Sequence, residues 1–406
     1  MSASEGDPAV RRRPKDRKAQ IARASTDAFG SQGYHAVSME DIAARVGITP
    51  AALYRHSPSK YDLFRDAVLG LSQMLVDATA FADDRTDDDP AVLLRALTSA
   101  LVDATIANRT AGGLYRWEAR YLRDPDRALL VDQLKVVNRR LQVPLAQLRP
   151  KLTPSQLRTL LTATLSVIGS ITDHSNPLAT SEIRACLTTM ASDLLAADLP
   201  AARRRGVPRE VVSVGAEAGM YEHVLYESVR LFYEHGYRNT SMEDIASAVG
   251  IQTSGLYRSF PGKADILALA YRRAADRRSS DTADALSRTA DPEAAMDELI
   301  DDYLGRVMES PDLPYVYYTE RRNVPEADLR VLDTIEHSTM DAWARLVTAA
   351  RPEMKIGVAR YAVAAALSLT VDFGRLFNRE SDSDSVATVR RLMEVTLLGR
   401  PVRHRR

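Results

Sequence analysis

The chain contains an internal repeat. Residues 29–64 align without a gap to residues 232–267 at an offset of 203, and 18 of the 36 positions are identical. Beyond this window the likeness fades but keeps its offset within one residue, as where Glu118-Ala119-Arg120 matches Glu320-Arg321-Arg322. Because 406 residues also exceed what one hydrophobic core usually holds, the repeat predicts two related units in tandem.

Helical periodicity dominates both units. Apolar residues recur at three- and four-residue spacing, as in residues 93–102 and 131–145, and no segment shows convincing strand alternation. Proline-containing breaks separate the periodic segments at positions 89–90, 124–125, 153–154, 176–177, 291–292, 324–325 and 351–352. The sequence therefore predicts an all-α fold with roughly nine helices per unit.

Charge and composition bound the class of protein. The 54 basic and 54 acidic side chains cancel, but basic runs at residues 11–15 and 203–205 lie just before each copy of the repeat, and another ends the chain at 403–406. The single cysteine, Cys186, excludes an intramolecular disulfide and fits a reducing compartment. The N-terminus lacks a signal-peptide core, and the apolar stretches 160–171 and 358–373 are short for a membrane span. We expect a cytoplasmic protein with no membrane partner.

Neither metal chemistry nor catalysis is indicated. The seven histidines show no short ligand spacing and have no cysteine partners. Nucleophile-elbow, phosphate-loop and zinc-protease motifs are missing from the sequence. We therefore expect no cofactor and no enzymatic activity.

The repeated block has the pattern of a helix-turn-helix. Ser38, followed three residues later by Asp41, predicts the capped start of a short helix over residues 39–46. Gly47 can adopt the left-handed backbone that turns the chain, Ile48 fills the corner, and a second helix is expected over residues 50–56. In such a unit the second helix enters the major groove of DNA.

The start of that second helix would meet base edges. In the first copy these positions hold the mostly apolar set Thr49, Pro50, Ala51 and Ala52. The second copy offers the more polar Gln252, Thr253, Ser254 and Gly255, so the two copies are expected to read different sequences.

Other side chains are placed for phosphate contact, which positions a protein on DNA without specifying sequence. They are Ser38, Tyr54, Arg55, His56 and Lys60 in the first copy and Ser241, Tyr257, Arg258, Ser259 and Lys263 in the second. The alternative for the two tyrosines is an amphipathic surface position with the hydroxyl in water. The run at 11–15 is either a solvated tail or an arm that reaches DNA.

The block resembles the N-terminal domain of the tetracycline-repressor (TetR) family. The likeness rests on the aromatic-Gly-Tyr run, the acidic-Ile-Ala helix, the Val-Gly turn and, in copy two, Leu256-Tyr257-Arg258-Ser259-Phe260-Pro261-Gly262-Lys263. Copy one departs from the family pattern because Ser57 stands where a buried aromatic is expected. Losing that much core could cost a few kcal/mol, which predicts a less rigid first copy or one unable to bind alone.

The resemblance implies a helical ligand-binding and dimerisation domain after each DNA-binding head. We expect the following segments: a basic arm (1–14), the first head (15–64), its helical domain (65–198), a linker (199–214), the second head (215–267), its helical domain (268–400) and a basic tail (401–406). Aromatic residues near the fifth helices either line a ligand cavity or pack in the core, namely Tyr115, Trp117, Tyr121, Tyr315, Tyr317 and Tyr318.

The leading hypothesis is a ligand-responsive repressor whose two heads act as an internal pseudo-dimer on double-stranded operator DNA, with an unidentified small-molecule effector. Two chains could pair further as a homodimer. The alternative is a small-molecule-binding or assembly protein whose duplicated heads have lost DNA binding, with Ser57 as the first sign.

Overall fold

The computed structural model describes residues 14–85, 88–200, 219–376 and 383–399. All regular elements in these ranges are helical, which confirms the predicted all-α class. The basic runs at 203–205 and 403–406, and the arginines of the first run, lie outside the described residues.

The chain divides into two compact units. Unit 1 comprises Met1–Ala80 and Asn108–Val137, and unit 2 comprises Phe81–Ala107 and Asn138–Arg406. The division does not follow the sequence repeat, because helices of the first repeat pack with helices of the second inside unit 2.

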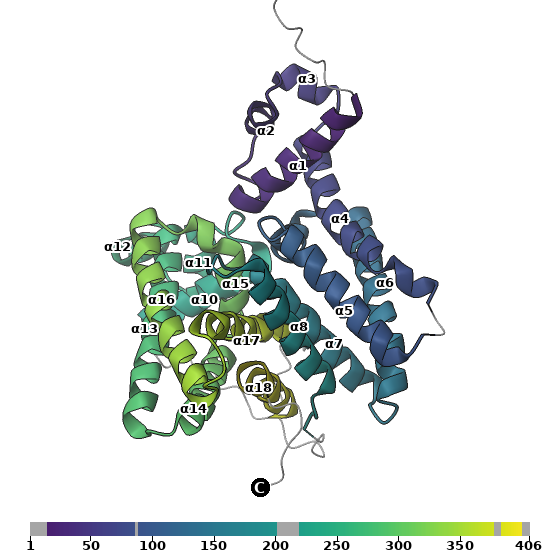
Figure 1. Cartoon of the computed structure of the whole chain (residues 1–406). Helices are drawn as coiled ribbons and strands as arrows, with labels where there is room; N and C mark the ends of the chain where they lie inside the picture. The colour runs from purple at the N-terminus through teal and green to yellow at the C-terminus, as the bar shows by residue number, and fades with distance from the viewer. Residues whose placement is uncertain (1–13, 86–87, 201–218, 377–382, 400–406) are drawn as a thin grey trace, which may run out of the picture. The chain divides into compact units, whose positions relative to one another are not determined.

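Unit 1 holds the first head. Its helices are α1 (Pro14–Gln32), α2 (Met39–Val46), α3 (Pro50–Tyr54) and α4 (Lys60–Ala78), and they follow one another at the purple end of Figure 1. A π-helical turn, η2 (Leu114–Glu118), the short η3 (Ala119–Tyr121) and the start of α6 (Asp124–Leu148) complete the unit. Its core includes Phe29 and Phe64, whose rings meet edge to face with centroids 5.5 Å apart.

The rest of the first repeat lies in unit 2. It consists of the remainder of α6, most of η1 (Ala80–Asp83), and α5 (Pro90–Ala107), α7 (Pro154–Gly169), η4 (Ser170–Thr172) and α8 (Thr180–Ala196). The predicted breaks are confirmed, since α5 and α7 begin at prolines, where a missing amide proton costs nothing. The predicted helix 50–56 is shorter than expected, because α3 ends at Tyr54.

The second repeat lies wholly in unit 2. Its elements are α10 (Met220–His235), α11 (Met242–Val249), α12 (Thr253–Ser259), α13 (Lys263–Arg288), α14 (Pro292–Glu309), α15 (Leu313–Glu320), η5 (Arg321–Asn323), α16 (Glu326–Ala350), α17 (Ile356–Leu376) and α18 (Ser383–Leu398). Buried Trp343 of α16 donates a 3.0 Å hydrogen bond from Nε1 to Thr282 Oγ1 of α13. This bond satisfies the indole N–H in the core of the second helical domain.

Four helices join the two repeats inside unit 2. Helix α17 packs on α7 and α8, and α18 packs on α8, as the teal and yellow helices of Figure 1 show. We call α7, α8, α17 and α18 the central bundle. Contacts at its edges also join the repeats: the Tyr361 hydroxyl donates a 2.8 Å hydrogen bond to the Asn176 carbonyl before α8, and Lys355, just before α17, forms a 2.6 Å ion pair with Glu182.

Among the described residues, two helices are long and apolar enough to cross a membrane by length and composition, Pro90–Ala107 and Ile356–Gly374. In the second, 67% of the apolar window is buried inside the protein. Ala362 and Leu369 of α17 are fully buried, so stretch 358–373 forms the core helix that the sequence predicts.

Candidate nucleic-acid interface

The first helix of each helix-turn-helix is fixed by the predicted cap. The Asp41 amide donates to Ser38 Oγ at 3.1 Å, and the Ser38 amide donates to Asp41 Oδ2 at 2.8 Å. Ser241 and Asp244 form the same reciprocal pair in the second head. Hydrogen bonds from the serine hold the pKa of Asp41 and of Asp244 below their ordinary value. The hydroxyl of Ser38 is thus engaged in its cap.

A left-handed glycine makes each turn. Gly47 has φ +70° and Gly250 has φ +75°, a conformation that costs glycine nothing. The amides after the helix close the turn, with Ile48 donating to the Ala43 carbonyl and Ile251 to the Ala246 carbonyl, both at 3.0 Å. The chain is thereby redirected into the second helix within two residues.

The two recognition helices, α3 and α12, share one anchor and differ at their starts. Leu53 and Leu256 are fully buried and hold each helix on its head. Thr49 caps α3 by accepting the Ala52 amide at 3.2 Å, whereas Gln252 makes no side-chain cap bond for α12. The exposed positions here are Thr49, Pro50, Ala51, Gln252 and Ser254, with Ala52, Thr253 and Gly255 half-buried.

The expected phosphate-contacting side chains mostly lie on the surface. Tyr54 is 49% exposed and Tyr257 is 53% exposed, so neither is a core residue. Exposure is shared by the neighbouring Arg55, His56, Arg258 and Ser259. This surface carries positive charge and hydroxyl groups next to each recognition helix, which is the chemistry that phosphate contact requires.

The two lysines have intramolecular partners instead of open ammonium groups. Lys60 donates to the Val37 carbonyl at 2.9 Å, and Lys263 donates to the Tyr237 and Thr240 carbonyls at 2.7 Å each. Burial lowers the pKa of Lys263. These contacts favour a structural role for both lysines over the phosphate contact expected from sequence, because their protons are directed at backbone oxygens.

Glutamates outside the heads hold the same loops. The Tyr34 amide donates to Glu118 Oε2 at 3.0 Å, and the Tyr237 amide donates to Glu320 Oε1 at 3.2 Å. Sequence reasoning missed this role for both residues. The signal was present, because the repeat aligns Glu118 with Glu320 at an offset of 202.

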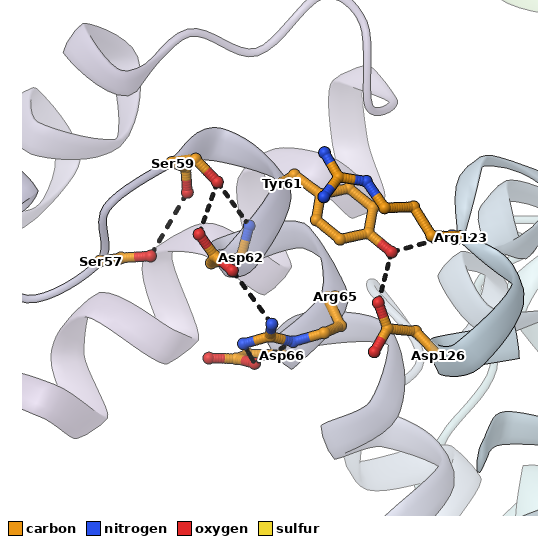
Figure 2. Close-up of polar contacts among 8 residues, drawn as sticks. All are labelled: Ser57, Ser59, Tyr61, Asp62, Arg65, Asp66, Arg123 and Asp126. Atoms are coloured by element: carbon orange, nitrogen blue, oxygen red, sulfur yellow. Dashed lines mark hydrogen bonds and ion pairs between the residues drawn. The ribbon is translucent and has the colours of Figure 1, made fainter.

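A second joint of unit 1 links α4 to α6 (Figure 2). The Tyr61 hydroxyl donates to Asp126 Oδ2 at 2.5 Å and accepts the Arg123 amide at 2.8 Å. The Arg123 guanidinium lies over the Tyr61 ring, 4.0 Å from its centroid. Burial and the Asp126 hydrogen bond raise the pKa of Tyr61, so its hydroxyl stays protonated. The joint couples α4, which starts in the first head, to the start of α6.

The comparisons with known proteins bear on these heads. A family model described as "Bacterial regulatory proteins, tetR family" matches residues 21–67 and again residues 224–270. The two matches cover both helix-turn-helix units and the starts of α4 and α13.

The chain thus carries two tandem copies of the TetR-family N-terminal domain.

Relatives of this chain include a transcription regulator. The HTH-type transcriptional activator FasR of Mycolicibacterium smegmatis (strain ATCC 700084 / mc(2)155) is 33% identical over 121 residues. That alignment covers 30% of this chain and spans only about half, 54%, of the relative's own length.

Solved structures of TetR regulators are also similar. PfmR from Thermus thermophilus matches with a TM-score of 0.39 and 21% identity, covering 45% of this chain and 97% of that one. The ketosteroid regulator KstR2 of Mycobacterium tuberculosis matches with a TM-score of 0.41 and 17% identity, covering 46% and 96%.

The departure of the first TetR head from the family pattern is visible at the end of its recognition helix. Ser57 is buried, 5% exposed, and its hydroxyl donates to the Ser59 carbonyl at 3.3 Å (Figure 2). In the second head, Phe260 is 3% exposed and belongs to the core. A polar turn thus replaces an aromatic plug in the first head.

The aromatic residues near the fifth helices of the two repeats contribute to packing. Tyr121 stacks on Tyr34 of the first head with centroids 5.7 Å apart, and Trp117 is buried. Tyr115 packs against the core of unit 1, and Tyr317 against a core cluster of unit 2. Rings also meet between Tyr315 and Tyr233 and between Tyr317 and Tyr318. These contacts favour the core-packing alternative over a ligand cavity.

Proposed function

We propose that this chain is a transcription regulator that binds operator DNA through both heads, which act as an internal pseudo-dimer on two half-sites. One observation carries the proposal: matched helix-turn-helix frames in one chain present recognition helices with different exposed residues. TetR-family relatives are named as transcription regulators, which supports the DNA-binding part.

The central bundle supports the pseudo-dimer part. Contacts across it join the two repeats of one chain, including those of Tyr361 with Asn176 and Lys355 with Glu182. Arg391 of α18 also donates to the Asp198 carbonyl at 3.2 Å, just after α8. One chain is thus expected to supply both heads and the interface between them, which in a symmetric dimer come from two chains.

Mass in solution tests this arrangement. Light scattering would be recorded for the chain alone and for the chain bound to genomic fragments selected for affinity. We expect one chain per protected site of two half-sites, with centres about 34 Å or somewhat more apart. Two chains per site would show that one head per chain serves as scaffold or that four heads engage DNA.

The operator is expected to be an imperfect palindrome, because the recognition helices differ. Gln252→Ala should relax base preference on one half-site only, at a cost of about 1 to 3 kcal/mol if the amide reads a base. Thr49→Ala is the matched change in the first head. An unchanged sequence preference in both variants would show that neither side chain reads a base.

Regulation is proposed to be ligand-responsive repression in the cytoplasm. A small molecule that releases DNA must bind the non-binding conformation better than the binding one. A reporter under the selected operator should rise when the chain is deleted; a fall would make the chain an activator, as the relative FasR is named.

A second candidate function rests on Ser57. The polar residue at this buried site favours a binding or assembly protein whose heads have lost DNA contact. Absent or salt-insensitive binding to genomic DNA would select this candidate over the first.

A further inference from the structure

The loop between the first two helices of each head is held on one side by a buried carboxylate. Glu118 is 5% exposed and accepts the Tyr34 amide, and Glu320 is 2% exposed and accepts the Tyr237 amide. The second oxygen of Glu320 accepts the Asn323 side-chain amide at 2.8 Å. Burying a carboxylate is costly unless it is hydrogen-bonded, so these bonds are a condition for the fold of each loop.

A lysine at the start of α4, and its counterpart at the start of α13, contacts the same loop. The Lys60 ammonium lies 4.7 Å from the Tyr34 ring centroid, and the Lys263 ammonium lies 4.4 Å from that of Tyr237. Both ammonium groups also bond to loop carbonyls, such as that of Val37. The loop therefore has its N–H held by one element and its carbonyls by another.

The glutamates come from outside the heads. Glu118 ends η2 and Glu320 ends α15, in the segments that precede α6 and α16. Their neighbours have diverged between the copies, with Trp117 matching Thr319 and Ala119 matching Arg321. A buried carboxylate kept at one position between changed neighbours, with the same amide partner, indicates a shared task.

We propose that Glu118 and Glu320 are positioning residues through which each helical domain sets its own head for DNA binding. The inference rests on the proposed function and names the connection that regulates it. The held loop leads directly to the serine that caps the next helix, α2 or α11. That helix ends at the left-handed glycine, after which the recognition helix begins. Each helical domain thus has its own contact with its own head, so the two heads can be released separately.

The test uses the full chain and changes each glutamate in three ways. Alanine removes the acceptor, aspartate keeps the charge but shortens the reach by one methylene, and glutamine keeps an acceptor oxygen at full length without the charge. Controls are Asp132→Ala for the first repeat and Glu326→Ala for the second, since both carboxylates are at least 67% exposed and pair with a lysine or arginine nearby on the same helix. Two quantities are measured: amide hydrogen exchange of residues 33–38 and 236–241 without DNA, and protection of each half-site of the selected operator.

The expected result is specific to one head. Glu118→Ala and Glu118→Asp should speed exchange of 33–38 about tenfold or more and weaken protection of one half-site by a similar factor, because a buried N–H loses its partner. Glu118→Gln should behave like the wild type, and the second loop and second half-site should not change. The Glu320 series should give the mirror image.

Contrary results separate the two proposals. If wild-type chain protects operator and the Ala and Asp variants leave both measurements unchanged, the inference is overturned and the proposed function stands. Equal loss at both half-sites would also overturn it, because general destabilisation is not directed at one head. If wild-type chain protects no DNA, the proposed function fails, and the positioning role in DNA binding fails with it. Where an Ala variant does not fold, the Asp and Gln pair decides.

Discussion

Tyr221 and Phe260 stack in the second head with ring centroids 5.0 Å apart and planes inclined by 26°. The repeat places Lys18 and Ser57 at the same positions in the first head, an exposed side chain and a buried hydroxyl. An aromatic pair therefore packs at the end of the recognition helix in the second head but not in the first. The two heads should differ in cohesion although their turns are nearly identical.

Phe260→Ser should give the second head the character of the first. Removing a buried ring costs about 3 kcal/mol or more of local stability, because a cavity replaces its packing. Amide exchange over residues 242–260 measures this opening. Tyr257→Phe, at an exposed position, is the control and should change stability by less than about 0.5 kcal/mol. Equal exchange in Phe260→Ser and wild type would show that the ring contributes little.

Lys263→Met should lower the stability of the second head even without DNA. The variant keeps the side chain's length but loses hydrogen bonds to the Tyr237 and Thr240 carbonyls, each worth about 1.5 to 3 kcal/mol when charged. The slope of log affinity against log salt should stay unchanged. Arg258→Ala, the exposed comparison, should reduce that slope by about one unit. If Lys263→Met instead reduced the salt slope and left the stability unchanged, Lys263 would be assigned to phosphate contact.

Gly30→Ala should weaken unit 1. A Cβ at Gly30 would lie 3.0 Å from Ala111 Cα and 3.1 Å from the Thr110 carbonyl oxygen, and backbone atoms cannot yield cheaply. Overpacking of this kind costs about 1 to 3 kcal/mol. Gly70→Ala, where a Cβ meets nothing within 4 Å, should instead stabilise α4 by about 0.5 to 1 kcal/mol. Exchange rates in α1 and α4 distinguish the two changes.

Ser38→Ala should raise the pKa of Asp41 toward its ordinary value of 3.8, because the serine hydroxyl is the largest cause of its depression. A depressed pKa in the folded state contributes stability above the unfolded value, and this is lost as pH falls through the folded one. The variant should therefore lose less stability than wild type between neutral and acid pH. NMR titration of Asp41 measures this, and Ser241→Ala, which changes Asp244, should leave it unaltered.

Features set by short-range chemistry could be predicted from the sequence. Ser38 caps α2 and Gly47 turns the chain as expected, because both act on backbone groups within four residues. Pro90 and Pro154 begin helices for the same local reason. The frame of each head, and the residues on its exposed side, followed from such patterns.

Long-range partners could not be predicted in this way. Lys60 has the charge expected of a phosphate ligand, but its ammonium group donates hydrogen bonds to carbonyls 23 and 25 residues away. For Tyr121 the sequence left a cavity and core packing open, and its ring stacks on one 87 positions earlier in the chain. The partition into units also depends on how α17 packs on α7, which no local signal encodes.

The central bundle has a consequence for cells that hold few copies of this protein. Two separate subunits come apart on dilution, whereas segments of one chain meet at an effective concentration fixed by the connection between them. Packing of α17 on α7 is intramolecular, so it does not weaken as the protein becomes scarce. The two repeats that build the bundle also reach the cell in equal numbers, because one chain contains both.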